Sequence, residues 1–280
     1  MTTSIHTNTS AMIALQNLNR TNDQLASTQS RVNTGLKVQG ARDNAAVWAV
    51  AQGQRADRGS LEAVATSLKR ATSIADVSLA AGEQISDLLV ELKSKATAAS
   101  DESATLAMRT SYNDEFQALL KSVQSFAENA IFDGSNILDG SATAGINFLA
   151  SADGAETITL NRQNLTLTGL GLAANAAATP ATTAPDLLSK ANADNALSRI
   201  NAAISTSTAR LAELGAQSKQ IERHTTYVGK LSDALEAGIG NLVDADMAKE
   251  SARLTALQVQ QQLGVQALSI ANQSPQIILS

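Results

Sequence analysis

Apolar residues recur at alternating intervals of three and four along most of this chain. The pattern runs without a break from Leu61 to Ala99 and again from Leu197 to Leu242. Such spacing places one apolar stripe along a helix, as in coiled coils, and both stretches far exceed the ~11–12 residues of an average globular helix. The sequence therefore predicts long helices that pack side by side. The expected stripe positions are Leu61, Val64, Leu68, Ala71, Ala75, Ser78, Gly82, Ile85, Leu89, Leu92, Ala96 and Ala99, then Leu197, Ile200, Ile204, Ser207, Leu211, Leu214, Ser218, Ile221, Thr225, Val228, Ser232, Leu235, Ile239 and Leu242.

A shorter helix is expected between these two stretches. Ser103 is its predicted N-cap, because a serine hydroxyl can accept a hydrogen bond from a free backbone N–H in the first turn. Its stripe carries the bulkiest side chains of the chain, so we expect it to anchor the core. The predicted stripe positions are Tyr112, Phe116, Leu119, Val123 and Phe126.

Residues 131–172 have a different character from the helical stretches. Three Asp-Gly pairs, which favour tight turns, separate short runs in which apolar and polar residues alternate. Ile146 and Phe148 alternate before the Asp153-Gly154 pair, and Ile158 and Leu160 alternate after it, which predicts a β-hairpin. An Ala/Thr/Pro-rich connector follows. The fold class is therefore mainly α, a long antiparallel coiled-coil-like rod with a small hairpin region and paired N- and C-terminal helices.

Composition excludes several classes of function. The chain has no cysteine and only two histidines, so thiolate chemistry has no basis and a multi-histidine metal site is poorly supported. A net charge of −5 without a basic stripe argues against a nucleic-acid binder. We find no metalloprotease motif, nucleophile elbow or phosphate-binding loop. We therefore expect no enzymatic activity, no cofactor, no bound metal, and no nucleic-acid partner.

Both ends of the chain are almost free of charge. No charged residue follows Arg253, and only His6 precedes Arg20. Glutamines interrupt the apolar residues near the C-terminus, so no block approaches the ~20 apolar residues of a membrane span, and membrane insertion is not expected. In a polymer each residue meets copies of itself, so an uncharged surface avoids repulsion. Spacing alone leaves open the alternative that these are the frayed ends of a monomeric bundle.

Motifs at both ends resemble those of one known family. RVNTGLKV at 31–38 and ARDNAA at 41–46 are similar to the N-terminal signature of bacterial flagellins, R-L-S-S-G-x-x-I-N-S-A-x-D-D-A-A. DADMAKE at 244–250 resembles the family's D-A-D-x-A-x-E, and QQQ at 260–262 with ANQSPQ at 271–276 resembles its Q-Q-A and A-N-Q-x-P-Q ending. The likeness covers roughly residues 1–140 and 190–280. The chain is thus identified as a short flagellin without large outer domains.

The resemblance implies a structural subunit that polymerises into the flagellar filament for motility. Residues 1–44 and 242–280 would be the two halves of an inner tube domain. Residues 45–189 would supply the N-terminal helices, hairpin region and linker of a spoke domain, and 190–241 its C-terminal helix. Partners implied are other copies, sister flagellins, hook-associated and cap proteins and an export chaperone. The implied location is outside the cell, after type III export.

The same resemblance implies contacts for polymerisation and a surface for glycans. Deleting residues 243–280 should spare the rod and abolish filaments, because the ends should order only on assembly. Trp48, the single tryptophan, should pack at a junction or a subunit contact. The expected polymerisation contacts are Leu15, Leu18, Leu25, Arg31, Val32, Gly35, Asp43, Trp48, Asp246, Leu254, Leu257, Gln261, Leu268 and Asn272; candidate glycan acceptors in a region expected to be exposed are Ser141, Thr143, Thr166, Thr168, Thr179, Thr182 and Thr183.

Two alternatives stay open at this point. A hook–filament junction protein shares the terminal helices, although it usually lacks so close a pair of C-terminal motifs. A type III secreted translocator would use amphipathic helices to enter a host membrane, but it requires a longer apolar block than this chain contains.

Overall fold

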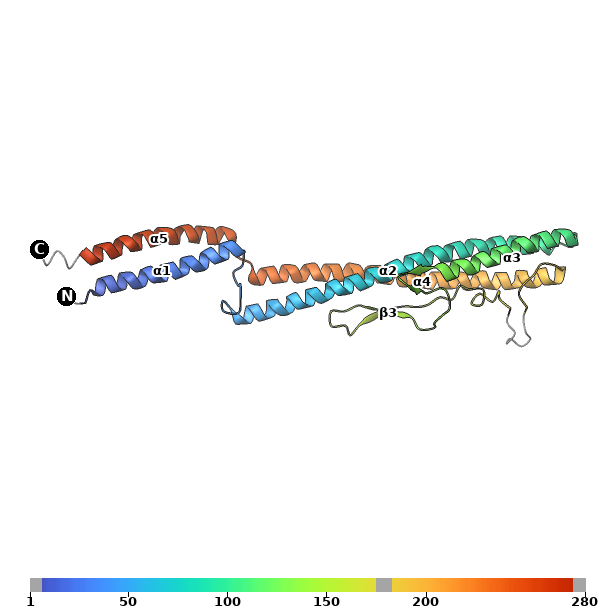
Figure 1. Cartoon of the computed structure of the whole chain (residues 1–280), viewed down its shortest axis with the longest axis horizontal. Coiled ribbons are helices and arrows are strands. Elements are labelled where there is room, and N and C mark those ends of the chain that lie inside the picture. The colour runs from blue at the N-terminus through green and yellow to red at the C-terminus, as the bar shows by residue number, and fades with distance from the viewer. Residues whose placement is uncertain (1–6, 175–182, 274–280) are drawn as a thin grey trace. The chain divides into compact units, whose positions relative to one another are not determined.

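The computed structural model describes residues 7–174 and 183–273. Its helices are α1 (Thr9–Thr34), α2 (Ala45–Ala99), α3 (Leu106–Asn129), α4 (Lys190–Val243) and α5 (Met247–Gln273). Contacts divide the chain into two compact units, Met1–Arg58 with Asp233–Ser280, and Gly59–Ser232. The predicted order of elements and the mainly α class are confirmed, and Figure 1 shows α1 beside α5 in the first unit and α3 along α2 in the second. The predicted boundary after residue 44 lies at the start of α2, and the predicted boundary before residue 242 lies just ahead of the end of α4 at Val243. The division into an inner tube domain and a spoke domain stays a prediction.

The α2 stripe is the most regular part of the core. Every predicted position from Leu61 to Ala99 is buried, and Ile74 adds one more large side chain. Ser78 sits in this stripe because its hydroxyl donates to the Ile74 carbonyl at 2.7 Å, which satisfies the only polar group that it buries there.

The predicted α4 stripe is only partly correct. Ile200, Leu214, Ile221 and Val228 are buried as expected. Leu197, Ile204, Leu211, Thr225, Ser232, Leu235 and Leu242 are half-buried, and the buried positions include Ala193, Ala196 and Ala203 instead. Small alanines let a neighbouring element approach closely, so they take positions that a pattern of large side chains does not reveal.

The predicted core face of α3 was wrong in its second half. Phe116 and Val123 are buried, but Leu119 is half-buried and Phe126 is 40% exposed. Leu120 and Ala127 occupy the core in their place. The series Phe116, Leu120, Val123, Ala127 has intervals of four, three and four, and the predicted series had intervals of three, four and three. Both fit one face of a helix, so spacing alone could not decide between them.

The predicted N-cap of α3 was also wrong. The cap is Thr105, whose hydroxyl accepts the N–H of Met108 at 3.3 Å. Ser103 instead donates its N–H and hydroxyl to the Asp101 carboxylate, each at 2.8 Å. A capping side chain must reach the second or third N–H of the helix, and Ser103 lies too early for a helix that begins at Leu106.

Two antiparallel hairpins follow α3. β1 (Ile131–Phe132) and β2 (Ser135–Asn136) join through Asp133 and Gly134, both at positive φ, as a two-residue turn of this kind requires. β3 (Ile146–Leu149) pairs with β4 (Thr157–Leu160), with Phe148 opposite Ile158. The predicted hairpin is confirmed, and Phe148 and Leu160 bury its inner face.

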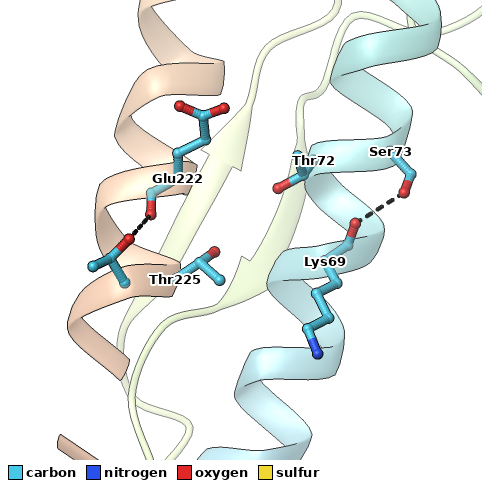
Figure 2. A pocket seen from close by; sticks show the side chains of 6 residues that line it. Lys69, Thr72, Ser73, Glu222 and Thr225 are labelled. Atoms are coloured by element: carbon cyan, nitrogen blue, oxygen red, sulfur yellow. Dashed lines mark hydrogen bonds between the residues drawn. The ribbon is translucent and has the colours of Figure 1, made fainter. Parts of the chain in front are cut away.

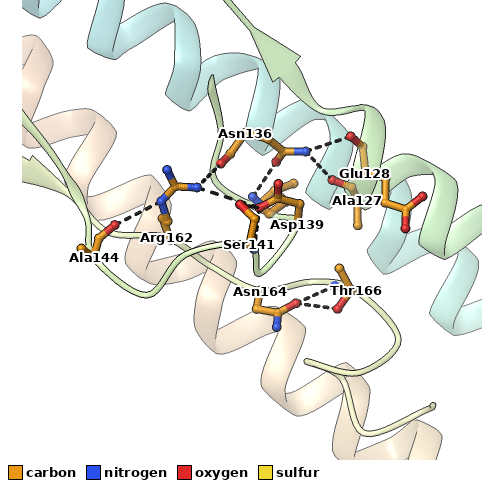
Figure 3. Close-up of polar contacts among 10 residues, drawn as sticks. Ala127, Glu128, Asn136, Asp139, Ser141, Ala144, Arg162, Asn164 and Thr166 are labelled. Atoms are coloured by element: carbon orange, nitrogen blue, oxygen red, sulfur yellow. Dashed lines mark hydrogen bonds and ion pairs between the residues drawn. The ribbon is translucent and has the colours of Figure 1, made fainter. Parts of the chain in front are cut away.

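A polar cluster fastens these hairpins to the end of α3 (Figure 3). Arg162 donates to the carbonyls of Asn136 at 2.6 Å and Ala144 at 3.1 Å, and lies 3.9 Å from the Asp139 carboxylate. The Asn136 amide in turn donates to the carbonyls of Ala127 and Glu128. These bonds satisfy carbonyls at the α3 C-terminus, which otherwise lack intrahelical partners.

Candidate assembly surface

In the first unit, α1 and α5 run antiparallel to each other, and Thr9 and Gln273 lie at the same end of the pair (Figure 1). The contact between the two helices buries little. Among their described residues only Thr28, Glu250 and Leu257 are buried. Most other side chains remain partly or fully accessible, so the pair by itself does not make a closed core.

Amide groups hold part of the contact. The Gln261 side-chain amide donates to the Asn22 side-chain oxygen at 2.8 Å, and Asn8 donates to the Ala271 carbonyl at 2.7 Å. Leu18 lies so near Gly264 that a Cβ there would be 3.2 Å from its methyl group. Polar residues in the predicted stripes are therefore used between the two helices, where an amide can both donate and accept.

The remaining apolar side chains of the pair point outward. Val259, Leu263, Val265 and Ile270 are at least half exposed on α5. Val259, Leu263 and Ile270 follow one another at four and seven residues, so they share one side of α5, away from the positions of Gln261 and Gly264 that meet α1. Val265 lies on a further side of the helix, so α1 leaves all four uncovered. Exposed apolar residues of α1 are Met12, Ile13 and Leu15. The pair thus offers apolar side chains on faces that neither helix covers for the other.

An ion pair links α1 to α5 near the junction. Arg31 lies 3.5 Å from the Glu250 carboxylate, and Glu250 is only 8% exposed. The other carboxylate oxygen of Glu250 is buried without a hydrogen-bond partner among the described residues. Sequence reasoning nominated Arg31 but not Glu250, although Glu250 closes the DADMAKE motif.

The connectors before α2 and before α5 are joined through their backbones. The N–H groups of Lys37 and Val38 donate to the Val243 carbonyl at 2.7 and 3.2 Å, and Ala245 donates to the Gly35 carbonyl at 2.8 Å. Gly35 adopts φ 71°, which caps α1 and turns the chain into the connector. The two connectors, residues 35–38 and 243–245, are therefore held together by a short ladder of backbone hydrogen bonds and are not independent loops.

Trp48 packs on the apolar cluster beside this ladder. The cluster consists of Val38, Ala51, Ile239 and Val243, with Trp48 partly buried against it. The single tryptophan thus packs at the junction, which is one of the two positions predicted for it, the other being a subunit contact. Asp43 and Asp246 shape the neighbouring turns by accepting backbone N–H groups.

The structure also fixes the surroundings of the other predicted contact residues. Leu18, Leu25, Val32, Leu254, Gln261 and Leu268 are half-buried, Leu257 is buried, and Leu15 and Asn272 are exposed. All of them belong to α1 or α5, so the paired helices bring most predicted contact positions onto one element pair. No second chain is present, and their contacts between copies stay predictions.

The candidate glycan acceptors differ in exposure. Ser141, Thr143, Thr168 and Thr183 are exposed. The exposure expected for Thr166 was wrong: it is 5% exposed, and its hydroxyl donates to Asn164 at 2.6 Å, because this loop folds back on itself. Thr179 and Thr182 lie outside the described residues.

A groove of about 540 Å³ lies between α2 and α4 in the second unit. Lys69, Ser73, Glu222 and Thr225 are among its lining residues (Figure 2). Ser73 donates its hydroxyl to the Lys69 carbonyl and Thr225 to the Ile221 carbonyl of its own helix. All four hydroxyls that line the groove donate to carbonyls of their own helices, and Lys69 and Glu222 are the charged residues among its lining residues.

Shifted pKa values arise at surface ion pairs, in turns and at partly buried arginines. A hydrogen bond from Lys95 to Glu115 raises the pKa of the lysine, and the Ser151 hydroxyl lowers the pKa of Asp153. Burial lowers the pKa of Arg199, whose guanidinium holds three backbone carbonyls of the loop region. Within the described ranges no group of acids and histidines could hold a metal ion, and no helix is long and apolar enough to cross a bilayer.

These features define a structural protein: long helices with a continuous core, and a terminal helix pair that leaves large apolar side chains exposed on its outside. Its sequence matches the bacterial flagellin N-terminal helical region over residues 5–143 and the C-terminal helical region over residues 197–280. The chain belongs to the flagellin family. It is a structural subunit of the bacterial flagellar filament, and the family forms that filament outside the cell.

Individual flagellins match along nearly the whole chain. Flagellin FljM of Caulobacter vibrioides is 49% identical over 99% of this chain and 97% of its own. A flagellin of Brucella melitensis is 38% identical over 99% of this chain and 98% of its own. A crystal structure of Bacillus cereus flagellin has a TM-score of 0.49 and 21% identity, covering 57% of this chain and 86% of that one.

Proposed function

We propose that the α1–α5 pair forms the inner layer of the filament by packing against the same pair in neighbouring copies. The observation that carries this proposal is the set of large apolar side chains that the pair leaves exposed on its outside. Val259, Leu263 and Ile270 are each at least 50% exposed in the single chain. Burying a side chain of this kind stabilises an assembly by about 1.5–3 kcal/mol, and several per copy add up along a polymer.

Ordering of the terminal helices is coupled to this packing. A helix that buries only Leu257 and Glu250 against its partner recovers little of the conformational entropy lost when its backbone is fixed. Contacts with several neighbours bury the remaining faces, so folding of the ends and polymerisation occur together. Arg31 and Glu250 then set the register of the pair within each copy.

Other partners follow from the same surface. Before export, α5 needs a protein that covers its apolar faces, which is the task of an export chaperone. Hook-associated and cap proteins would meet the terminal helices at the two ends of the filament. The exposed hydroxyls of Ser141, Thr143, Thr168 and Thr183 would carry glycans on the outer surface, together with Thr179 and Thr182.

Removal of residues 247–280 tests the central claim. The cut is placed after Asp246 because Val243 belongs to the junction cluster and accepts two N–H groups from the first connector. We expect the truncated chain to keep the helical circular dichroism of its rod and the Trp48 emission of the junction, and to form no filaments under salt conditions that polymerise the full chain. Filaments from the truncated chain, seen by electron microscopy, would contradict the proposal.

Electron microscopy and a vesicle assay separate the alternatives. A hook–filament junction protein would give short rings or caps instead of long filaments. A translocator would permeabilise anionic vesicles, and the full chain should not.

A further inference from the structure

A second apolar surface lies in the rod, away from the terminal helices. Val77, Ala80 and Ala81 of α2 line a groove of about 330 Å³ together with Phe126 of α3, whose ring is 40% exposed. Gln84 and Asn129 place two amides at its margin. The groove is large enough for one aromatic ring, and the amides could hydrogen-bond a phenol hydroxyl. No described side chain of this chain fills it.

An acidic stripe runs beside the groove on the outer face of α2. Asp76, Glu83 and Asp87 follow one another at seven and four residues, so they share one side of the helix. All three are exposed, and none forms an ion pair with another described residue.

A basic stripe of the same length lies on α4. Lys219, Arg223 and Lys230 follow at four and seven residues, are exposed, and likewise form no ion pair within the described chain. Tyr227 projects beside them and is 57% exposed. The helix α4 therefore presents the Tyr227 ring among basic side chains, and α2 presents a groove beside acidic side chains.

We propose that these two surfaces meet between neighbouring copies of this chain, with Tyr227 of one copy in the Phe126 groove of the next. The inference rests on the proposed function, because it names a contact within the filament. Opposite charges bring the stripes together and fix their register, while the ring and groove bury apolar area. The contact joins two different patches, so it continues from copy to copy as a helical polymer requires.

The contact also fixes how far neighbouring copies are displaced along the rod. Within one chain, Gly82 of the groove region lies against Leu211. Tyr227 is sixteen residues further along α4. At 1.5 Å per residue, neighbouring rods must be offset by about 24 Å for the ring to reach the groove.

Cysteine crosslinking tests the contact cleanly because the chain has no cysteine of its own. One preparation carries Ala80→Cys beside the groove, and a second carries Thr226→Cys next to Tyr227. Both positions are exposed, so the fold should be kept. We expect a disulfide-linked dimer in filaments grown from the mixture and none in filaments of either chain alone. Ala212→Cys is the control, since it would approach Ala80→Cys only if the copies were not offset.

Charge exchange provides a second, independent test. Reversal of the basic stripe (Lys219→Glu, Arg223→Glu, Lys230→Glu) should raise the critical concentration for polymerisation roughly tenfold, and so should reversal of the acidic stripe (Asp76→Lys, Glu83→Lys, Asp87→Lys). An equimolar mixture of the two chains should restore it, because each then meets its complement.

Three results would overturn the inference: filaments without the Ala80–Thr226 crosslink, a crosslink to Ala212→Cys instead, or no rescue in the mixture. A wild-type chain that forms no filaments at all would overturn the proposed function and this contact with it. Filaments that lack only the crosslink would leave the proposed function intact.

Discussion

At the junction, Gly35 has a backbone conformation that few other residue types adopt without strain. Gly35 lies at φ 71°, where a residue with a Cβ is strained, yet no atom lies within 4 Å of the position that a Cβ would take. Substitution there would therefore report backbone strain alone. This strain would weaken the backbone hydrogen bonds that join the two connectors, because the Gly35 carbonyl accepts one of them.

We expect Gly35→Ala to lower the free energy of unfolding of the first unit by roughly 1–2 kcal/mol, and Gly35→Asn to cost less, since Asn tolerates left-handed backbone. Urea denaturation followed through Trp48 emission measures both. Gly53→Ala is the matched control, because Gly53 is helical and has open space around it, so the same exchange should be neutral or slightly stabilising. Equal effects at Gly35 and Gly53 would refute the argument.

At the scale of the element, the apolar residues of α3 allow two different faces of the helix to be buried. The spacing of large side chains favoured Phe126 as a core residue, and the structure places Ala127 there instead. Phe126 is left on the surface beside α2. The choice depends on the neighbouring helix, because an alanine can approach a packed face where a phenylalanine cannot enter.

Two phenylalanine substitutions distinguish these faces. Phe116→Ala should lower the free energy of unfolding of the rod by about 3–5 kcal/mol, because Phe116 is fully buried. Phe126→Ala should cost roughly 1–2 kcal/mol, because part of the ring is already in water. Thermal or urea unfolding followed by circular dichroism measures both. The predicted face contains both phenylalanines, so an equally large loss at Phe126 would mean that this face, and not the observed one, is correct.

At the scale of the whole molecule, the two units divide the tasks of a filament subunit. The second unit has a continuous buried core and is stable through its own packing. The first unit has the small Trp48 cluster, two ion pairs and a helix pair with exposed apolar faces. The first unit therefore gains most from contact with other copies.

A charge placed on the outside of α5 should affect polymerisation without affecting the monomer. Leu263 is 57% exposed, so Leu263→Glu should leave the monomer's circular dichroism and Trp48 emission unchanged. It should block polymerisation, because every copy would bring a buried carboxylate into the assembly. Ala142→Glu, on an exposed loop of the second unit, is the control and should polymerise normally. Sedimentation after salt addition gives both results, and normal filaments from Leu263→Glu would count against the inner-layer assignment.

The sequence by itself determined the helices, their order, the β3–β4 hairpin and the family. Local rules suffice for these features: the α2 stripe is a sustained period, and Asp-Gly pairs favour turns whatever surrounds them. It also located the uncharged ends and most of the predicted contact residues on α1 and α5. The family motifs are contiguous, so no tertiary information was needed to find them.

The tertiary structure alone decided which face of α3 and α4 is buried, that Thr105 caps α3, that Thr166 is buried, and that Glu250 pairs with Arg31. Each depends on a partner distant in sequence or on the exact turn at which a helix begins. Periodicity leaves two faces of a helix nearly equivalent, and the difference between them is the free energy of packing against a neighbour. That neighbour also explains why alanines fill parts of the core and why Phe126 is left at the surface.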